Sequence, residues 1–463
     1  MYTISNRLRL TAIVLMLVGA LGVGYGFISS NKTLEEVKTM LAEGDAHGGH
    51  AQASHAEETH KMETEAHVVA DDAEHSDNAH DTNTHGATEA VHHGDAHAEH
   101  VMHAMHNRPW SAFYIAAFFF FMISLGVLAF YAIQYASQAG WSPLLLRVME
   151  GITAYVLPGG LIVLLIAALS NFIGHYNIFV WMDPEVVAHD KLIQGKTGWL
   201  NVSGFIIRGL IFIAGWSLYR YFARKFSLAQ DKAEDNKNFK KTFRISAAFL
   251  VFFIYTESIM SWDWIMSVDP HWFSTLFGWY VLAGMLVCGI TVIALITIYL
   301  KSKGLLPKVN DSHLHDLAKF MFGFSIFWTY LWFSQFMLIW YSNIPEEVTY
   351  FVTRIEDYKL PFFGMVVMNF IFPFLILMNS DYKRVPWFVV MAGIVILAGH
   401  YVDVFNMIMP ATVGDQWYIG IPEICSMLFF IGLFIFIVFT ALTKAPLEPT
   451  RNPFIKESEH FHY

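Results

Sequence analysis

The hydrophobic positions of this chain fall into long, unbroken runs that alternate with short polar segments. Nine of these runs reach about 20 residues, the length that a helix needs to cross a bilayer. They lie near residues 111–137, 145–173, 199–222, 244–267, 273–300, 317–341, 359–379, 386–409 and 418–442. A tenth run, residues 10–27, has no small-residue cleavage site, so we interpret it as a retained anchor helix rather than a signal peptide. The pattern predicts an all-α polytopic membrane protein with ten transmembrane helices.

Residues 243–284 hold two of these runs, joined by the turn SVDPHWFS at residues 267–274. Glu257 and Asp263 lie inside or near the first run. A carboxylate in a membrane span is costly unless it has a partner or a function. We therefore expect this hairpin to be important for what the protein does.

The composition supports a membrane protein: 55% of the residues are hydrophobic, 16% are aromatic and 15% are charged. The net charge is −10, and many of the acidic residues lie in residues 31–107. The chain has no cluster of basic residues of the kind that binds nucleic acid. Cys288 and Cys425 lie far apart in apolar runs, which excludes a disulfide framework, a CxxCH haem site and an iron–sulfur ligand set. We expect no cofactor in this chain, so any electron carrier belongs to another subunit.

Residues 31–108 form a low-complexity, His-rich segment that holds 14 of the 22 histidines. A segment so poor in apolar residues is not expected to bury a core. We interpret it as a solvated loop; weak metal binding and pH sensing are the alternatives.

The distribution of Lys and Arg predicts the orientation. With the N-terminus in the cytoplasm, the inner segments hold 20 of these residues and the outer loops hold eight. Cytoplasmic loops carry the excess of positive charge. We therefore expect ten passes through the membrane, both termini in the cytoplasm, and the His-rich loop on the outer side.

The domain organisation follows from these spans: 1–30 an anchor helix, 31–108 the loop, 109–268 and 269–412 two four-helix bundles, and 413–463 the last helix with a cytoplasmic tail. One faint repeat supports two parallel bundles, because Asp263 precedes Pro270 as Asp403 precedes Pro410, by seven residues. Chance is the alternative explanation. We expect bends in the third, eighth and tenth helices, at the prolines Pro158, Pro361, Pro373 and Pro422.

Few ionisable residues lie inside the spans. They are Glu150, Arg208, Glu257, Asp263, His400, Asp403 and Glu423. Both Arg208 and Glu257 fall near the predicted midplane, where they are natural counter-ions. His400 and Asp403 share one helix face through their i, i+3 spacing. Five of the seven lie at graded depths and resemble a proton relay: Glu257, Asp263, His400, Asp403 and Glu423. In this relay Arg208 would tune their pKa values, and Glu150 would admit protons from the cytoplasm.

A structural interpretation competes with this relay. Arg208 with Glu257, and His400 with Asp403, are equally consistent with locks between helices, while Glu150 is close enough to Arg147 to snorkel to the surface. Asp263 and Asp269 are consistent with hydrogen bonds in the turn. The aromatic clusters at residues 118–121 and 328–340 are typical of lipid-facing or packing surface.

Metal-based functions find little support. His400 is the only histidine well inside a span, which argues against a bis-His haem. His400 and Asp403 form a plausible zinc pair, but no second helix supplies the remaining ligands. A stand-alone secondary or metal-ion transporter remains the alternative function.

Two long motifs carry a resemblance to a known family. They are SIMSWDWIMSVDPHWFSTLFGWYVLAG at residues 258–284 and FSIFWTYLWFSQFMLIWYSNIPEEVTY at residues 324–350. The chain resembles the membrane subunits of alternative complex III, the bacterial quinol to cytochrome c or oxidase electron-transfer complex, over roughly residues 110–445. It looks most like one of the two NrfD-like membrane chains of that complex, which are relatives of the polysulfide-reductase membrane anchors.

The resemblance implies ten helices around two four-helix bundles. Implied partners are an NrfD-like sister subunit, multihaem cytochrome c subunits and an Fe–S protein, with a terminal oxidase as a further partner. The Gly-His-x-Gly-Thr pattern that we associate with the sister subunit's quinol site does not occur here. We therefore expect a cofactor-free subunit that contributes scaffold and a proton path, not quinol oxidation itself.

Overall fold

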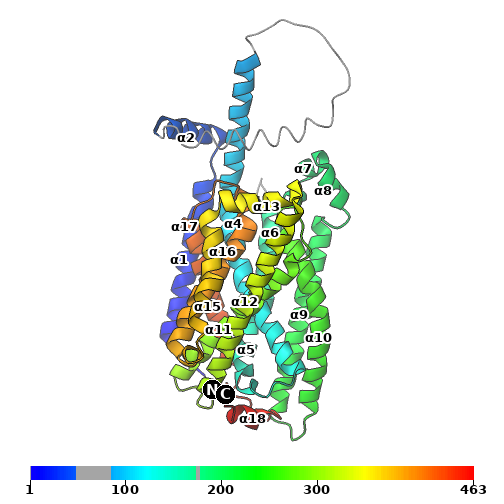
Figure 1. Ribbon diagram of the computed structural model, residues 1–463, viewed down its shortest axis with the longest axis vertical. Coiled ribbons are helices and arrows are strands. Elements are labelled where there is room, and N and C mark those ends of the chain that lie inside the picture. The colour runs from blue at the N-terminus through cyan, green and yellow to red at the C-terminus, as the bar shows by residue number, and fades with distance from the viewer. Residues whose placement is uncertain (1, 48–84, 174–177, 463) are drawn as a thin grey trace. The chain divides into compact units, whose positions relative to one another are not determined.

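The computed structural model of the protein describes residues 2–47, 85–173 and 178–462, and these residues form helices, turns and loops (Figure 1). Ten helical segments among them are long and apolar enough to cross a membrane, which confirms the predicted all-α polytopic class. Eight are single helices: α1 (Asn6–Ser30), α4 (His85–Ala136), α9 (Val202–Gln230), α10 (Lys237–Trp264), α11 (Phe277–Ser302), α12 (Asp311–Ser342), α16 (Pro386–Val413) and α17 (Ile421–Leu442).

The other two spans are interrupted helices. The third consists of α5 (Leu146–Ile152), the 3₁₀ turn η2 (Thr153–Tyr155) and α6 (Val156–Phe172). The eighth consists of α14 (Lys359–Val366), the π-helical turn η5 (Val367–Ile371) and α15 (Phe372–Leu377). Short helices connect the spans: η1 (Pro143–Leu145), η3 (Val180–Met182), α7 (Pro184–His189), α8 (Lys191–Lys196), η4 (Met266–Val268), α13 (Pro345–Glu356) and η6 (Tyr382–Arg384). A further short helix, α18 (Ile455–Glu459), follows the last span.

The prolines explain these interruptions only in part. The break in the third span ends three residues before Pro158, and the π turn of the eighth ends two residues before Pro373. The bends predicted at Pro361 and Pro422 are wrong, because each proline lies in the first turn of its helix. A first-turn N–H has no partner inside the helix, so proline is tolerated there without a kink.

Residues 1–28 and 107–463 form one compact unit, and α18 and α7 mark its two ends (Figure 1). The α18 end also holds both chain termini, whereas the α7 end holds α8 and α13. Consecutive spans run in alternating directions between the two ends. We use "α18 end" and "α7 end" below for these two regions.

Helices α4 and α11 are the most deeply buried spans of this unit. Within their most apolar windows, 94% and 89% of the residues are buried. Gly126 and Gly289 lie where the two helices touch, and a Cβ atom on Gly126 would collide with the Met285 carbonyl group. Small residues let helix backbones approach closely inside a membrane, where hydrophobicity does not drive helices together. These two helices therefore form the centre of the helix packing.

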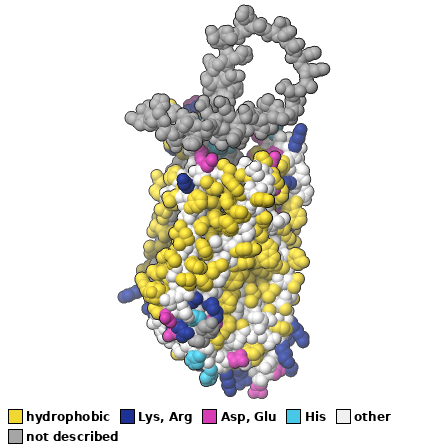
Figure 2. Space-filling model, viewed as in Figure 1, with side chains coloured by type: hydrophobic (Ala, Val, Ile, Leu, Met, Phe, Trp, Pro, Cys, Tyr) yellow, Lys and Arg dark blue, Asp and Glu magenta, His cyan; other side chains and the backbone are white. Residues whose placement is uncertain are grey.

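The sides of the unit are apolar and its ends are charged. Figure 2 shows hydrophobic side chains over most of the visible face between the ends, with Lys, Arg, Asp and Glu gathered near each end. Exposed apolar residues include Leu165, Leu210, Tyr255 and Leu375, each on a different span. This distribution is what a lipid-facing surface requires.

Residues 29–106 form a second unit. The expectation of a segment without a core is wrong at both flanks. Helix α2 (Leu34–His47) lies at one flank and α4 begins at His85 on the other, and Val37, Ala98 and Val101 form a small buried cluster. Ala, Glu and Met favour helices, which explains this structure despite the segment's low complexity. The middle of the His-rich segment, residues 48–84, lies outside the described residues.

The two Asp-to-Pro segments behind the suggested repeat fold differently. Pro270 lies in the turn beyond α10, whereas Pro410 lies inside α16. A proline inside a helix leaves the carbonyl group four residues earlier without its N–H partner, and that carbonyl belongs to Asn406. Arg354 Nε donates to the Asn406 oxygen at 2.9 Å and replaces the missing bond.

Candidate functional site

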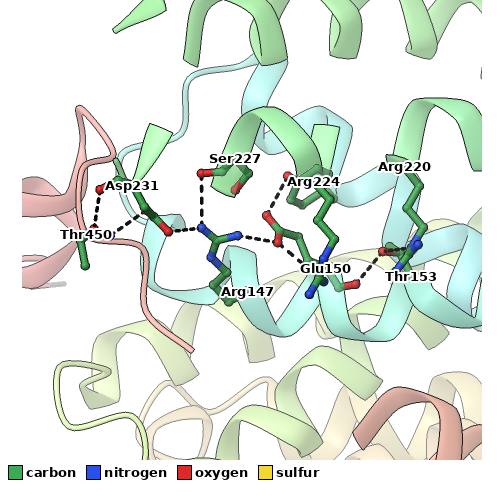
Figure 3. Close-up of polar contacts among 9 residues, drawn as sticks. Arg147, Glu150, Thr153, Arg220, Arg224, Ser227, Asp231 and Thr450 are labelled. Carbon is green, nitrogen blue, oxygen red and sulfur yellow. Dashed lines mark hydrogen bonds and ion pairs between the residues drawn. The ribbon is translucent and has the colours of Figure 1, made fainter. Parts of the chain in front are cut away.

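The α18 end contains a buried network of ions centred on Arg147 (Figure 3). Its Nη1 atom lies 2.8 Å from Glu150 Oε2, and its Nη2 atom pairs with Asp231 and donates to the Ser227 carbonyl group at 3.3 Å. Tyr131 also donates to Glu150, at 3.1 Å. The side chains of Arg147 and Glu150 are only 2% and 3% exposed. The suggestion that Glu150 snorkels to the surface is therefore wrong, because its charge is compensated inside the protein.

Glu423 lies at the α7 end, in the first turn of α17, and is paired with Arg108 of α4. Arg108 Nε and Nη2 donate to the two carboxylate oxygens at 2.7 and 2.8 Å. The carboxylate also accepts the backbone N–H of Gly420, and the guanidinium lies 3.1 Å from the Tyr418 ring centroid. A bidentate Arg–carboxylate pair is among the strongest hydrogen-bonded arrangements in proteins. This arrangement fastens α17 to α4.

Arg208 does not pair with Glu257 as expected, but with Asp263. Its Nε atom lies 2.6 Å from Asp263 Oδ2, and Trp199 Nε1 donates to the other carboxylate oxygen at 2.8 Å. Arg208 lies six residues after the start of α9, or about 9 Å along the helix axis, so it is near the α7 end rather than the midplane. Asp263 is next to the last residue of α10, at the same level.

Glu257 is fully buried and has only neutral partners. Its carboxylate accepts from Ser261 Oγ at 3.0 Å and from Ser258 Oγ at 3.4 Å, both on its own helix. Within the part of the chain that the structure describes, no cationic nitrogen lies within 4.0 Å of it. An ionised carboxylate in such surroundings would be strongly disfavoured, because burial without a counter-ion favours the neutral acid.

His400 and Asp403 lie together on one face of α16, as their spacing predicts. His400 Nδ1 is 3.4 Å from Asp403 Oδ2. Trp328 Nε1 donates to the same oxygen at 2.9 Å, and Tyr280 donates to Oδ1. The Trp328 ring also packs edge-on against the imidazole, with 5.2 Å between centroids. Three helices, α11, α12 and α16, thus surround one buried carboxylate with neutral donors.

Buried polar atoms without a partner accompany this pair. His400 Nε2 has no hydrogen-bond partner among the described residues, and neither do the two amide atoms of Asn369. Asn369 is fully buried in the π turn η5 and packs against Gly399, the neighbour of His400. Buried polar groups are almost always satisfied by protein or water. Together with the π turn, which is frequent at functional sites, the unsatisfied atoms identify this region as the candidate site.

The predicted relay residues do not form one chain of contacts. Among the described residues, the seven candidates make two ion-pair contacts with one another: His400 touches Asp403, as expected, and Arg208 touches Asp263. Sequence reasoning missed Arg108, Arg147, Tyr280 and Trp328 as partners of the acids. The tryptophan and tyrosine residues carry no distinguishing signal in a chain with 16% aromatic residues.

The turn of the 243–284 hairpin is held by contacts at the α7 end. Lys196 Nζ donates to the Pro270 carbonyl group, and His271 Nε2 lies 2.6 Å from Asp190 Oδ2. The backbone N–H of Ile193, with His271 as a further donor, holds the pKa of Asp190 below its ordinary value. Trp272 stacks on Tyr350 with 3.9 Å between centroids. The turn is a packed junction with α8 and α13.

No group of three or more His, Cys, Asp and Glu side chains that could hold a metal ion occurs in the described ranges, from which residues 48–84 are missing. Comparison with known proteins does not assign the chain to a family. No protein-family model matches the sequence. No curated protein matches it either.

Proposed function

We propose that this chain is a cofactor-free membrane subunit of a respiratory quinol-oxidising complex, in which it provides scaffold and a path for protons. The complex would be alternative complex III of a bacterial inner membrane, as the motifs at residues 258–284 and 324–350 suggest by resemblance. The Lys and Arg distribution supports cytoplasmic termini, and we therefore assign the α18 end, which holds both termini, to the cytoplasmic side.

The observation that carries the proton path is the presence of buried titratable groups inside the spans without permanent counter-ions. His400 lies 14 residues from the start of α16, or about 21 Å along its axis, and is fully buried. Glu257 is also fully buried and lies seven residues before the end of α10, about 10 Å along its axis. Groups held by neutral donors change protonation state without leaving an opposite charge stranded, so they suit proton transfer better than ion pairs do.

The geometry around His400 supports a simple transfer step. A proton that arrives at Nε2 converts the imidazole to imidazolium, and the proton on Nδ1 then passes to Asp403 Oδ2. Trp328 and Tyr280 fix the carboxylate in place and stabilise its charge between transfers. The step needs water at Nε2, and Asn369 and His400 provide polar atoms that would hold it.

The remaining candidates fit a structural role better. Glu150, Asp263 and Glu423 are each paired with an arginine at one end of the unit. Protonation of Asp263 or Glu423 would leave an arginine without its counter-ion, and protonation of Glu150 would remove one of the two counter-ions of Arg147. We assign them to the scaffold, which narrows the proton path to Glu257, His400 and Asp403.

Single substitutions in the reconstituted complex test the proton path. We expect Glu257→Gln and Asp403→Asn each to lower the rate of proton release during quinol oxidation by about 100-fold, which is within the range that general acid–base groups contribute. Glu346→Gln on exposed α13 is the matched control and should leave the rate unchanged. An unchanged rate and stoichiometry in both test variants would refute the path.

Purification from the native membrane tests the complex itself. A subunit should co-purify with haem absorbance that denaturation assigns to other chains. A stand-alone secondary transporter would instead purify alone and without colour, and that outcome would overturn the assignment to a respiratory complex while leaving a proton path through His400 intact.

A further inference from the structure

A groove of about 410 Å³ lies at the α18 end, between α9, α17 and the start of the third span. Three cationic side chains line it: Arg220 and Arg224 from α9, and Lys444 just beyond α17. Phe436, Ile437 and Ala441 form an apolar wall on α17. We propose that this groove binds an anionic phospholipid, with its phosphodiester group on the three cations and its acyl chains along the apolar wall.

The cations of the groove carry charge that the protein does not neutralise. Arg147 is the close partner of both Glu150 and Asp231, and Arg224 reaches Glu150 only at 3.9 Å (Figure 3). Arg220 Nε donates to the neutral hydroxyl group of Thr153 at 3.2 Å. No carboxylate of the described residues lies within 4.0 Å of Arg220 or Lys444. Among the described residues, Glu150 is the one carboxylate within 4.0 Å of these three cations, and Arg147 already pairs with it, which leaves the groove positive.

The position of the two arginines favours a single anion between them and Lys444. Arg220 and Arg224 are four residues apart on α9, so they lie on one face of the helix. Both side chains extend from α9 toward the third span in Figure 3. A phosphate group is the natural anion here, because guanidinium groups match its oxygens in geometry and charge.

The apolar surroundings favour a lipid over a soluble phosphate compound. Ala154 also lines the groove, and Leu157, Leu161 and Leu165 follow it along the third span at spacings of three and four residues. These leucines are 45%, 43% and 55% exposed. The result is an apolar track on a membrane-spanning helix that begins at the cations. A phospholipid combines a phosphodiester and acyl chains in that order.

Titration of the full-length protein with two lipids, followed by native mass spectrometry, tests the proposal. Phosphatidylglycerol should bind more tightly than phosphatidylcholine with the same acyl chains. The Arg220→Gln/Lys444→Gln variant should lose about 25-fold in affinity for phosphatidylglycerol, because each cation near an anionic lipid contributes about fivefold. Lys225→Gln, an exposed neighbour on α9, is the control and should bind as the unmodified protein does.

These variants leave Arg147, Arg224 and Glu150 in place, so the ion network that supports the fold is retained. A second measurement uses the unmodified protein: added salt should weaken phosphatidylglycerol binding and leave phosphatidylcholine binding unchanged. Equal affinity for the two lipids, or full affinity in the double variant, would overturn the proposal. Displacement of the lipid by millimolar inorganic phosphate would also overturn it and identify a site for soluble phosphate.

Discussion

The ends of the helical unit and its middle treat buried acids in opposite ways. At the ends, Glu150, Asp263 and Glu423 each lie within 3 Å of an arginine. In the middle, Glu257 and Asp403 are held by hydroxyl, indole and imidazole groups. The acids of one apolar chain therefore fall into two classes, which differ in whether an arginine or a neutral group lies beside the carboxylate.

Electrostatics explains why the two classes have different uses. Removing one partner of a buried ion pair leaves an uncompensated charge, which makes the pair a strong lock and a poor proton carrier. A buried acid with neutral partners leaves no opposite charge without a partner when it gains or loses a proton, so it is better suited to carry protons. Substitutions in the two classes should therefore differ in their effect on stability.

Loss of Arg147 should have the largest effect on stability. We expect Arg147→Met to lower the free energy of unfolding by about 3–5 kcal/mol, because Glu150 and Asp231 would remain buried or half-buried without their partner. Denaturant unfolding in detergent measures the change. Lys225→Met, on the exposed face of α9, should change it by no more than about 0.5 kcal/mol. A loss below about 1 kcal/mol for Arg147→Met would show that the arginine-paired acids at the ends do not stabilise the fold more than the acids with neutral partners.

Loss of Arg354 should have the second-largest effect on stability, because the hydrogen-bond partners of Arg354 are carbonyl groups rather than acids. Burial lowers the pKa of Arg354. Its guanidinium group packs over the Tyr350 ring and donates to the backbone carbonyl oxygens of Asn406 and Met407. We expect Arg354→Met to cost about 1.5–3 kcal/mol, the usual range for hydrogen bonds to a charged group.

A double-mutant cycle with Pro410→Ala identifies the cause of that loss. Alanine at this position restores the backbone N–H that the Asn406 carbonyl group lacks, so Arg354→Met should cost less in the Pro410→Ala background. The same unfolding assay measures all four proteins of the cycle. Equal costs in both backgrounds would show that Arg354 acts through packing and not through the freed carbonyl group.

The ten spans could be predicted from sequence because length and apolarity are properties of each segment alone. The partners of the acids could not, since they depend on which helices are neighbours and how each is rotated. Arg208 shows the difficulty: Glu257 and Asp263 are six residues apart, about 9 Å along α10, and only the packing of α9 selects Asp263. The His400–Asp403 pair was predictable because both residues lie on one helix.

Glu257→Gln should have a much smaller effect on stability than Arg147→Met. The amide has nearly the same shape as a protonated acid, accepts from Ser261 through its oxygen, and strands no counter-ion. We expect the free energy of unfolding to change by less than about 1 kcal/mol. A loss of about 3 kcal/mol or more would reveal an ionised Glu257 with a buried partner, and would move this residue into the class found at the ends.

Asp190 at the α7 end offers the smallest and most local test. Its carboxylate accepts the N–H groups of Ile193 and Leu192, and these bonds, with His271 as a further donor, hold its pKa below the ordinary value of 3.8. Because the folded pKa is lower than the unfolded one, the stabilisation is complete above the unfolded value and is lost as the pH falls through the folded one. Hydrogen exchange of the Leu192 and Ile193 amides, corrected for intrinsic rates, should show constant protection from about pH 7 to pH 5 and a decline below about pH 4. Asp190→Asn keeps the helix cap without a titrating group, so its protection should not change with pH over this range. A decline of equal size in both proteins would assign the effect to another group and exclude a charged Asp190 as the cap of α8.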